Sequence, residues 1–405
     1  MDIRLTPKPY RLINQIQHYA WGTRGDDAFI PQLLGITPEP ETPYAELWMG
    51  AHPKAPSSLL VDDEQVNLRE AIAEQPTFLL GKRVAKGFDG TLPFLFKVLS
   101  SAESLSIQVH PTKAQAERLH NQDPKHYPDA NHKPEVAIVL TELTALAGFK
   151  PGDEFMTALE TYPEIAEFAG AELAGMLARD QIKSLYARMT RRAVDEPAAL
   201  ATTVQALSQR LQRSARELTE IEARFLTLRE EYGNEDVGLF SLFLLNLVHL
   251  KRGEALYTEA GVPHAYLGGD IVECMANSDN VVRAGLTPKY KDVETLVEIL
   301  KPMTEAPLVE GRAHDGEIIY RTPASEFLVS RRTLAEGKTW DVPRSDGPEL
   351  YLITQGAIDV TWGDPGDVLR FRCGESFFVP AAVGRLRLSG RVESELFRVQ
   401  VPEKE

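Results

Sequence analysis

The amino-acid sequence predicts a mainly β protein with an α-helical insertion. Residues 1–151 and 251–405 contain short strand-like runs punctuated by Pro and Gly, a pattern typical of a sandwich or barrel. Residues 152–250 are instead rich in Ala, Glu, Leu and Arg, with apolar residues spaced three or four apart. Because this helical block lies between two β segments, we interpret it as an insertion into a β domain.

The chain of 405 residues divides into four predicted segments. Residues 1–151 and 251–312 form the two parts of one β domain, residues 152–250 form the helical insertion, and residues 313–405 form a C-terminal β domain. Within these segments we expect strands in 43–60 and 91–100, a long amphipathic helix or helix pair over 199–233, a buried core helix over 237–250, and a helix over 291–301.

Composition and charge exclude several classes of function. The formal net charge of −15 argues against a general nucleic-acid binder and against an anionic membrane surface as a partner. Cys274 and Cys373 are the only cysteines, which excludes a disulfide framework and a cysteine-rich zinc site. The N-terminus lacks the apolar core of a signal peptide, and the longest apolar run, 237–250, is shorter than the roughly 18 residues that a membrane span needs. We therefore expect a cytoplasmic protein with neither nucleic acid nor membrane as a partner.

The stretch SLSIQVHP, residues 104–111, alternates between polar and apolar side chains. Strict alternation is typical of a β-strand whose two faces differ. The polar face, which includes Gln108 and His110, either meets water or lines a cavity in which these side chains hold a ligand.

Two further stretches put candidate ligands on strands. In NHKPEVAIVL, Lys133 and Glu135 share a face where a buried strand begins, and in GVPHAYLGGD, His264 and Tyr266 share a face after a tight turn. Histidine and carboxylate side chains are common metal ligands. A single strand histidine is more often a satisfied or surface residue, however, and a glutamate at a strand start is usually solvated. Spacing alone therefore makes a metal site the less favoured interpretation.

A polar segment over residues 274–292 contains a candidate anion site. Arg283 follows two valines there, with Lys289 and Lys291 nearby. Arg283 either lies on the surface or binds a phosphate, which suits its planar guanidinium because two parallel hydrogen bonds can form.

A weak internal repeat links the two ends of the β region. The stretches GEALYTEAGVPH (253–264) and GESFFVPAAVGR (374–385) both begin Gly-Glu, run apolar, pass through a turn and end in a large polar residue. That residue is His264 in the first and Arg385 in the second. The pattern fits two copies of one β-fold, of which only the first keeps a ligand-type residue.

Together these pieces resemble the type I mannose-6-phosphate isomerases. Seven stretches in order carry the resemblance: HYAWG (18–22), ELWMGAHP (46–53), PFLFKVLS (93–100), LSIQVHP (105–111), NHKPE (131–135), GVPHAYL (261–267) and SDNVVRAGLTPKYKDV (278–293). The resemblance implies a zinc-dependent, monomeric isomerase of the cupin superfamily that interconverts mannose 6-phosphate and fructose 6-phosphate. It further implies two cupin-like jelly-roll β-barrel domains, the second without metal ligands, plus the helical domain.

The resemblance also implies the ligands of one Zn²⁺ per chain, namely Gln108, His110, Glu135 and His264. Amide oxygens are weak zinc ligands, so Gln108 rests on the family pattern alone. If the match holds, Ser106, Gln108 and His110 point into the barrel, whereas Leu105, Ile107 and Val109 pack outside it.

The chemistry of aldose–ketose interconversion needs a base that moves a proton between C1 and C2, and positive charge near the enediolate oxygens. The resemblance surrounds the pocket with Lys97, Lys133, Tyr266, Glu273, Asp279 and Arg283, with His132 as a further candidate for ring opening. Glu273, Asp279 and Lys133 all stay open as the base. We expect Arg283 and Lys133 to face the enediolate or the phosphate, with Ser106 and Lys289 as weaker phosphate contacts.

Two other functions fit the same residues. A non-haem iron oxygenase would use His110, Glu135 and His264 as a facial triad, but Gln108 and the basic segment after Arg283 speak against it. A non-catalytic sugar-phosphate-binding cupin is disfavoured because the metal ligands are retained.

Overall fold

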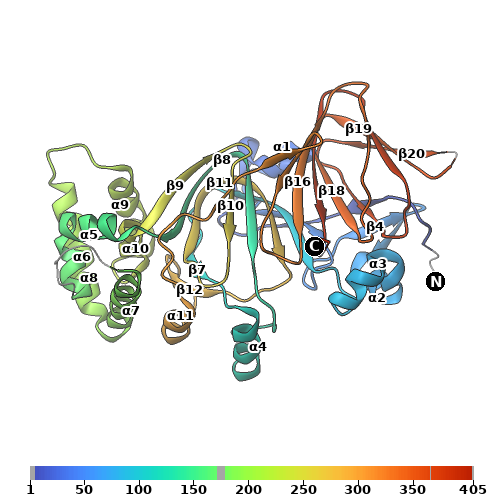
Figure 1. The fold of residues 1–405 in the computed structure, drawn as a ribbon. Helices are drawn as coiled ribbons and strands as arrows, with labels where there is room; N and C mark the ends of the chain where they lie inside the picture. Colours follow the sequence, from blue (N-terminus) through green and yellow to red (C-terminus); the bar gives the residue numbers. More distant parts are fainter. Residues whose placement is uncertain (1–4, 171–177, 365, 404–405) are drawn as a thin grey trace.

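A ten-stranded antiparallel sheet occupies the middle of the molecule (Figure 1). The computed structural model describes residues 5–170, 178–364 and 366–403. The central strand order is β13-β10-β8-β11-β6-β3-β2, and β9, β7 and β12 add to it beside β8 and β11. The strands are β2 (Gln15–Gln17), β3 (Glu46–Gly50), β6 (Phe94–Ser101), β7 (Ile107–Val109), β8 (Glu135–Phe149), β9 (Leu245–Lys251), β10 (Ala255–Thr258), β11 (His264–Ala276), β12 (Val282–Gly285) and β13 (Leu308–Val309).

Two further sheets form the region that contains the C-terminus. The nine-stranded sheet has the order β14-β15-β16-β23-β18-β21-β1-β4-β5, and the four-stranded sheet has the order β17-β22-β19-β20. Their strands are β1 (Tyr10–Ile13), β4 (Ser58–Val61), β5 (Glu64–Asn67), β14 (Arg312–His314), β15 (Glu317–Tyr320), β16 (Leu328–Leu334), β17 (Thr339–Asp341), β18 (Glu349–Gln355), β19 (Ala357–Trp362), β20 (Asp367–Arg372), β21 (Ser376–Val379), β22 (Leu386–Gly390) and β23 (Ser394–Gln400).

The first strand of the chain belongs to this C-terminal sheet. Tyr10 of β1 pairs with Phe378 of β21, and Leu12 of the same strand pairs with Leu59 of β4. Strand β1 thus joins β4 from the N-terminal part of the chain to β21 from the C-terminal part in one sheet, an arrangement that the division into consecutive segments did not anticipate. The four-segment division itself stays a prediction.

The mixture of β structure and inserted helices is confirmed, whereas the jelly-roll barrels are not. Among the described residues the strand orders are open and do not close into a barrel. Outside the insertion the helices are η1 (Gly25–Asp27), α1 (Phe29–Leu34), α2 (Leu68–Glu74), α3 (Pro76–Gly87), α4 (Lys113–Gln122) and α11 (Val293–Ile299). The last of these matches the helix expected over 291–301.

In the described part of the insertion, residues 152–170 and 178–250, six helices cover one end of the central sheet (Figure 1). They are α5 (Gly152–Thr161), α6 (Pro163–Ala169), α7 (Arg179–Asp195), α8 (Pro197–Gln212), α9 (Glu220–Tyr232) and α10 (Gly238–Leu244). One apolar core joins Phe155, Phe225 and Phe243 of these helices to Ile107 of β7 and Val282 of β12. The insertion therefore packs directly on the strands that carry candidate site residues.

The insertion differs from the prediction at its end. The stretch 199–233 forms the predicted helix pair, α8 and α9, and Thr219 starts the second helix with a capping box to Glu222. The stretch 237–250 is a helix only as far as Leu244, because Leu245–Lys251 pairs with β8 as strand β9. The prediction of one core helix over 237–250 was therefore wrong for its second half.

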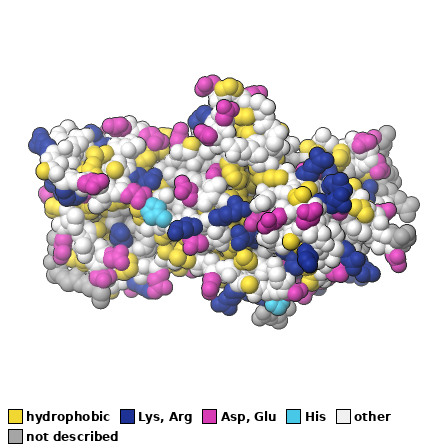
Figure 2. Space-filling model, turned by 90° about the horizontal axis from the view of Figure 1, so that it is seen from above, with side chains coloured by type: hydrophobic (Ala, Val, Ile, Leu, Met, Phe, Trp, Pro, Cys, Tyr) yellow, Lys and Arg dark blue, Asp and Glu magenta, His cyan; other side chains and the backbone are white. Residues whose placement is uncertain are grey.

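The surface carries both signs of charge. On the face in Figure 2, acidic and basic side chains are interspersed rather than separated into large patches. None of the helices in the described residues combines the length and the hydropathy that a membrane crossing requires.

Candidate active site

Three buried side chains converge within the central sheet. His110 directly follows β7, Glu135 begins β8 and His264 begins β11. The Nε2 atoms of both histidines lie 3.4 Å from Oε2 of Glu135. The three ligand atoms all lie within 4.8 Å of one another, so one ion could contact all three.

The sheet must curl strongly to bring these residues together. In the β8–β11 ladder, His264 pairs with Ala147 at one end, whereas Glu135 pairs with Met275 at the other end. The two side chains nevertheless meet at 3.4 Å, so the paired strands wrap around the site. Two register irregularities lie midway along the ladder, beside Gly268 and Gly269, and bulges of this kind bend a strand and increase its twist.

The hydrogen bonds behind the histidines fix which nitrogen faces the site. Nδ1 of His110 lies 2.9 Å from the carbonyl oxygen of Asn280, and Nδ1 of His264 lies 2.9 Å from that of Val262. A carbonyl can only accept, so each Nδ1 donates its proton and each Nε2 presents a lone pair. Burial lowers the pKa of His110 to about 4, which keeps this ring neutral at pH 7.

These facing atoms fit a divalent metal. Nε2 of His110, Oε2 of Glu135 and Nε2 of His264 are buried and have no hydrogen-bond partner among the described residues. Three buried acceptors that face one another leave their lone pairs uncompensated, which is costly unless a cation lies between them. Two imidazoles, each held by a carbonyl behind it, and one carboxylate form a donor set typical of zinc.

Gln108 is positioned beside this group by the backbone. Ile107 and Val109 of β7 are fully buried in the core shared with the helices, so Gln108 faces the opposite side of the strand. It pairs with His264 on one neighbouring strand and with Arg283 on the other. The predicted alternation is therefore correct over the three residues of β7.

The alternation fails just before the strand. Leu105 lies outside β7, and its backbone N–H donates to the carbonyl of Tyr266 at 2.8 Å. Its side chain packs against the cluster that contains Leu99 and Tyr266, rather than with Ile107 and Val109. The prediction that Leu105 shares their outer face was wrong, because the residue precedes the paired part of the strand and its side chain joins a different cluster. Ser106 lies in the same segment and is half-buried.

Lys133 shares Glu135 with the candidate metal site. Its Nζ lies 3.0 Å from Oε1 of Glu135, whereas Oε2 of that carboxylate faces the histidines. Burial opposes ionisation of Glu135, but Lys133 and His110 hold its pKa well below the ordinary value. The carboxylate is therefore ionised at neutral pH, with one oxygen for the lysine and the other for a cation.

A second buried group lies on the adjacent strands. Nζ of Lys97 lies 3.0 Å from Oε1 of Glu46 and 2.5 Å from Oε2 of Glu273. The other oxygen of Glu273, Oε1, accepts a hydrogen bond from the hydroxyl of Tyr266. Burial by itself would lower the pKa of Lys97, but the carboxylates of Glu273 and Glu46 raise it above its ordinary value. Trp48 fixes the other oxygen of Glu46 through its indole N–H.

Asp279 forms a third group with residues that the sequence analysis did not single out. Its Oδ2 lies 3.0 Å from Nζ of Lys54 and 3.7 Å from Nε2 of His52. His52 lies within the stretch ELWMGAHP (46–53) and Lys54 directly follows it, and this stretch served in the sequence analysis only as a motif of the resemblance. The polar residues at its alternate positions were the available signal.

Arg283 is half-buried on β12, and among the described residues no carboxylate lies within ion-pair distance of it. Burial lowers its pKa, yet a guanidinium stays charged at any working pH. A half-buried cation without a counter-charge suits an anionic ligand. Lys289, six positions further on, is exposed, and the amine of Lys291 is bonded to Asp236.

Comparisons with known proteins match this arrangement. A family model described as "Phosphomannose isomerase type I, catalytic domain" matches residues 10–152. The chain is 37% identical to the mannose-6-phosphate isomerase of Rattus norvegicus, over 98% of this chain and 96% of that protein. The chain belongs to the phosphomannose isomerase type I family. It is 39% identical to the human mannose-6-phosphate isomerase, over 87% of this chain and 88% of that protein.

Solved structures of phosphomannose isomerases have the same fold. A mutant of the enzyme from Salmonella typhimurium gives a TM-score of 0.85 at 33% identity, covering 97% of this chain and 99% of that one. A mannose 6-phosphate isomerase bound with zinc and yttrium gives 0.86 at 33% identity, covering 98% and 100%. This chain is therefore an isomerase with the family's whole architecture, and not only its catalytic domain.

In this phosphomannose isomerase, His132 contacts the C-terminal region. Its Nε2 lies 2.7 Å from Oε1 of Glu326, a buried carboxylate in the loop before β16. Neighbouring Lys133 instead points to Glu135. The two side chains thus have different partners, and no pattern in the sequence indicated the contact between His132 and Glu326.

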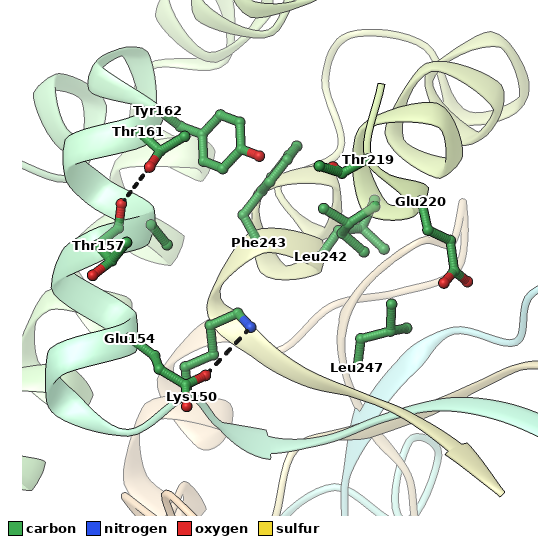
Figure 3. A pocket seen from close by; sticks show the side chains of 12 residues that line it. Lys150, Glu154, Thr157, Thr161, Tyr162, Thr219, Glu220, Leu242, Phe243 and Leu247 are labelled. Atoms are coloured by element: carbon green, nitrogen blue, oxygen red, sulfur yellow. Dashed lines mark hydrogen bonds and ion pairs between the residues drawn. The ribbon is translucent and has the colours of Figure 1, made fainter. Parts of the chain in front are cut away.

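A separate cavity lies in the helical insertion of the isomerase (Figure 3). Its volume is about 430 Å³, and the residues that line it include Lys150, Glu154, Tyr162, Leu242 and Phe243. None of its lining residues belongs to the predicted site.

Proposed function

We propose that this isomerase interconverts D-mannose 6-phosphate and D-fructose 6-phosphate through a cis-enediol, with one Zn²⁺ per chain. The observation that carries the proposal is the set of three buried, unpartnered atoms of His110, Glu135 and His264. They lie in a chain that is similar over nearly its whole length to mannose-6-phosphate isomerases.

His110, Glu135 and His264 would hold the metal, with Gln108 as the fourth ligand. Two neutral imidazoles, one carboxylate and one amide leave the site with net positive charge. When bound, the ion supplies positive charge beside the substrate oxygens on which negative charge develops. The zinc-bound relative supports zinc as the metal.

A buried and a half-buried carboxylate would take part in the proton chemistry. Ring opening needs one acid and one base, and the transfer between C1 and C2 needs a further base. Glu273, held between Lys97 and Tyr266, and Asp279, beside His52 and Lys54, are the carboxylates available.

The anionic parts of the substrate would meet the cations on the other side of the metal ligands. Arg283 lies next to Gln108 in the β7–β12 ladder and has no ion-pair partner among the described residues. Lys133 lies beside Glu135 and would stabilise the enediolate or the phosphate. Lys289 and Ser106 would add weaker phosphate contacts.

The strand curl in the first β region, together with a repeated strand–turn–strand stretch in the second, supports a cupin-like origin for both β regions. β8 and β11 wrap around the metal ligands, as expected for a jelly roll. Gly253 and Gly374, which begin the two repeat stretches, have φ of 85° and 83°, and in each stretch a strand, a turn and a second strand follow. The second copy has the exposed Arg385 where the first has His264.

A coupled assay tests the function directly. Zinc-loaded protein given fructose 6-phosphate should form mannose 6-phosphate, while glucose 6-phosphate serves as the substrate control. Absence of turnover in protein with measured zinc would refute the proposal. Tight sugar-phosphate binding without turnover would instead support a binding protein, and iron with oxygen consumption would support an oxygenase.

Metal content, sedimentation and fractionation test the accompanying expectations. We expect one zinc per chain, a monomer in solution and a cytoplasmic location. We also expect a small-molecule sugar phosphate as the only partner.

A further inference from the structure

Asp236, in the helical insertion, binds the loop that follows β12. Its Oδ1 accepts hydrogen bonds from the backbone N–H groups of Gly238 at 2.7 Å and Leu286 at 2.8 Å. Its Oδ2 accepts from the N–H of Thr287 at 3.2 Å and from Nζ of Lys291 at 3.2 Å. The carboxylate is only 3% exposed. One buried side chain thus organises four donors, three of which belong to residues 286–291.

The two backbones approach too closely at this point for side chains to fit between them. A Cβ on Gly285 would lie 2.4 Å from Cα of Gly238, and a Cβ on Gly238 would lie 2.5 Å from the backbone nitrogen of Leu286. Both would also lie 2.8 Å from Oδ1 of Asp236. Two glycines therefore let the insertion and the loop touch, and the carboxylate joins them.

Leu286 adopts a backbone conformation that needs external support. Its φ is +53°, in the left-handed region that branched residues rarely occupy. Such a residue persists only when its surroundings hold it in place. Here the hydrogen bond to Asp236 and burial in the helical core provide that support. Without the carboxylate, the loop would lose the contact that keeps it in this shape.

The loop held in this way lies between the two cations of the proposed phosphate site. Arg283 comes three residues before Leu286 and pairs with Gln108, whereas Lys289 comes three residues after it. We propose that Asp236 is a positioning residue through which the helical insertion holds Arg283 and Lys289 ready for the substrate phosphate. This inference rests on the proposed function, because it assumes that these cations bind a sugar phosphate.

The expected effect follows from preorganisation. If the loop holds the binding conformation for only a tenth of the time, the apparent affinity falls about tenfold, because substrate binding must first select that conformation. The chemistry occurs at the metal ligands and the buried carboxylates, so kcat should fall much less than 1/KM.

Glu222 of α9 provides a matched control. It is a second fully buried carboxylate in the same insertion, and it accepts hydrogen bonds from Arg216, Tyr162 and the N–H of Thr219. None of these partners belongs to the loop after β12. Replacing Glu222 should lower the stability of the protein, as replacing Asp236 does, but it should leave Arg283 and Lys289 in place.

The experiment compares D236N and E222Q in the zinc-loaded full chain. We expect D236N to raise KM for mannose 6-phosphate, and the inhibition constant of inorganic phosphate, about tenfold, with kcat changed by less than about threefold. E222Q should leave all three values within about twofold of wild type. Zinc content should equal that of wild type in both variants.

A D236N enzyme whose KM and phosphate inhibition match those of E222Q would overturn the inference. If D236N does not fold, K291M decides instead, because it removes the ion pair to Asp236 together with the hydrogen bond from the same amine to the carbonyl oxygen of Thr287 in the loop. An unchanged KM would then overturn the inference. Failure of the proposed function is distinguishable, since it would already appear as absent turnover in the wild-type protein.

Discussion

Two buried glutamates, one in each β region, have opposite surroundings. Glu135 in the catalytic region faces the Nε2 atoms of His110 and His264, which have no hydrogen-bond partner in the part of the chain that the structure describes. Glu349 in the C-terminal region is paired with the chain's own cations, because Nη2 of Arg398 lies 2.8 Å and Nη1 of Arg344 lies 2.7 Å from its Oε1. The first carboxylate has an oxygen left for an ion from outside, whereas the second is neutralised internally.

Arg283 in the catalytic region and Arg398 in the C-terminal region differ in the same way as the two glutamates. Arg283 is half-buried without an ion pair among the described residues, and burial lowers its pKa. Arg398 is buried as well, but Tyr351 and Glu349 outweigh the effect of burial and raise its pKa. One region thus keeps charged groups available for ligands, and the other uses them to hold its own sheets together.

Metal removal should give the largest effect, and it should affect only the catalytic region. We expect a chelator to lower kcat on the order of 10³-fold, because the positive charge beside the developing enediolate is lost. Added Zn²⁺ should restore the rate, measured by the coupled isomerase assay. A sample that is free of metal by elemental analysis and still works at the full rate would contradict the ligand assignment.

E349Q should destabilise the protein by about 3–5 kcal/mol, because it leaves two buried guanidinium groups without a full counter-charge. Urea unfolding followed by circular dichroism measures this change. The folded fraction should keep its zinc and its kcat/KM, since Glu349 belongs to the other region. If E349Q lost zinc without losing stability, the structural role assigned to Glu349 would be contradicted.

R283K keeps the charge but removes the planar guanidinium. We expect kcat/KM for mannose 6-phosphate to fall about 10- to 100-fold, because the bidentate contact to the substrate anion is lost. R387K is the control, since Arg387 is an exposed arginine that pairs with Asp341 in the C-terminal region. Equal kinetics for the two variants would mean that Arg283 does not meet the substrate.

E222Q should show the smallest effect, on the acid dependence of stability. Arg216 and the other hydrogen-bond donors around Glu222 lower the pKa of this carboxyl group to about 2. The stabilisation is present above the ordinary pKa of glutamate and is lost as pH falls from about 4.5 to about 2. We expect E222Q to cost about 1–2 kcal/mol at pH 7 and to flatten the stability curve over that interval. Urea unfolding at several pH values measures both, and an unchanged slope would contradict the shift.

The sequence was informative where function depends on short-range patterns. The alternation around Gln108 and the turn before His264 correctly indicated strands, and the apolar spacing correctly indicated the helix pair α8 and α9 and the helix α11. His110, Glu135 and His264 do meet in the fold. Periodicity could not have brought them together, because the contact depends on the curl of β8 and β11 over their whole length.

Other features depend on contacts between distant segments and could not be predicted. Nothing local indicates that His132 bonds to Glu326, nearly 200 positions away, or that Asp236 holds Leu286. The apolar run 237–250 was assigned to one helix, but an apolar run of this length fits a buried strand equally well, so the sequence alone could not separate the two. Pairing with β8 made its second half the strand β9.

The pairing of β1 with β21 has a consequence for synthesis of the chain. The backbone hydrogen bonds between β1 and β21, where Tyr10 pairs with Phe378, can form only after Phe378 has left the ribosome. Until then, β1 and β4 present an open edge, the kind of surface on which chains pair with one another. The C-terminal region, which contributes no candidate metal ligand, is therefore the partner that closes this edge. A chain truncated before β21 is expected to aggregate even though every proposed metal ligand is present.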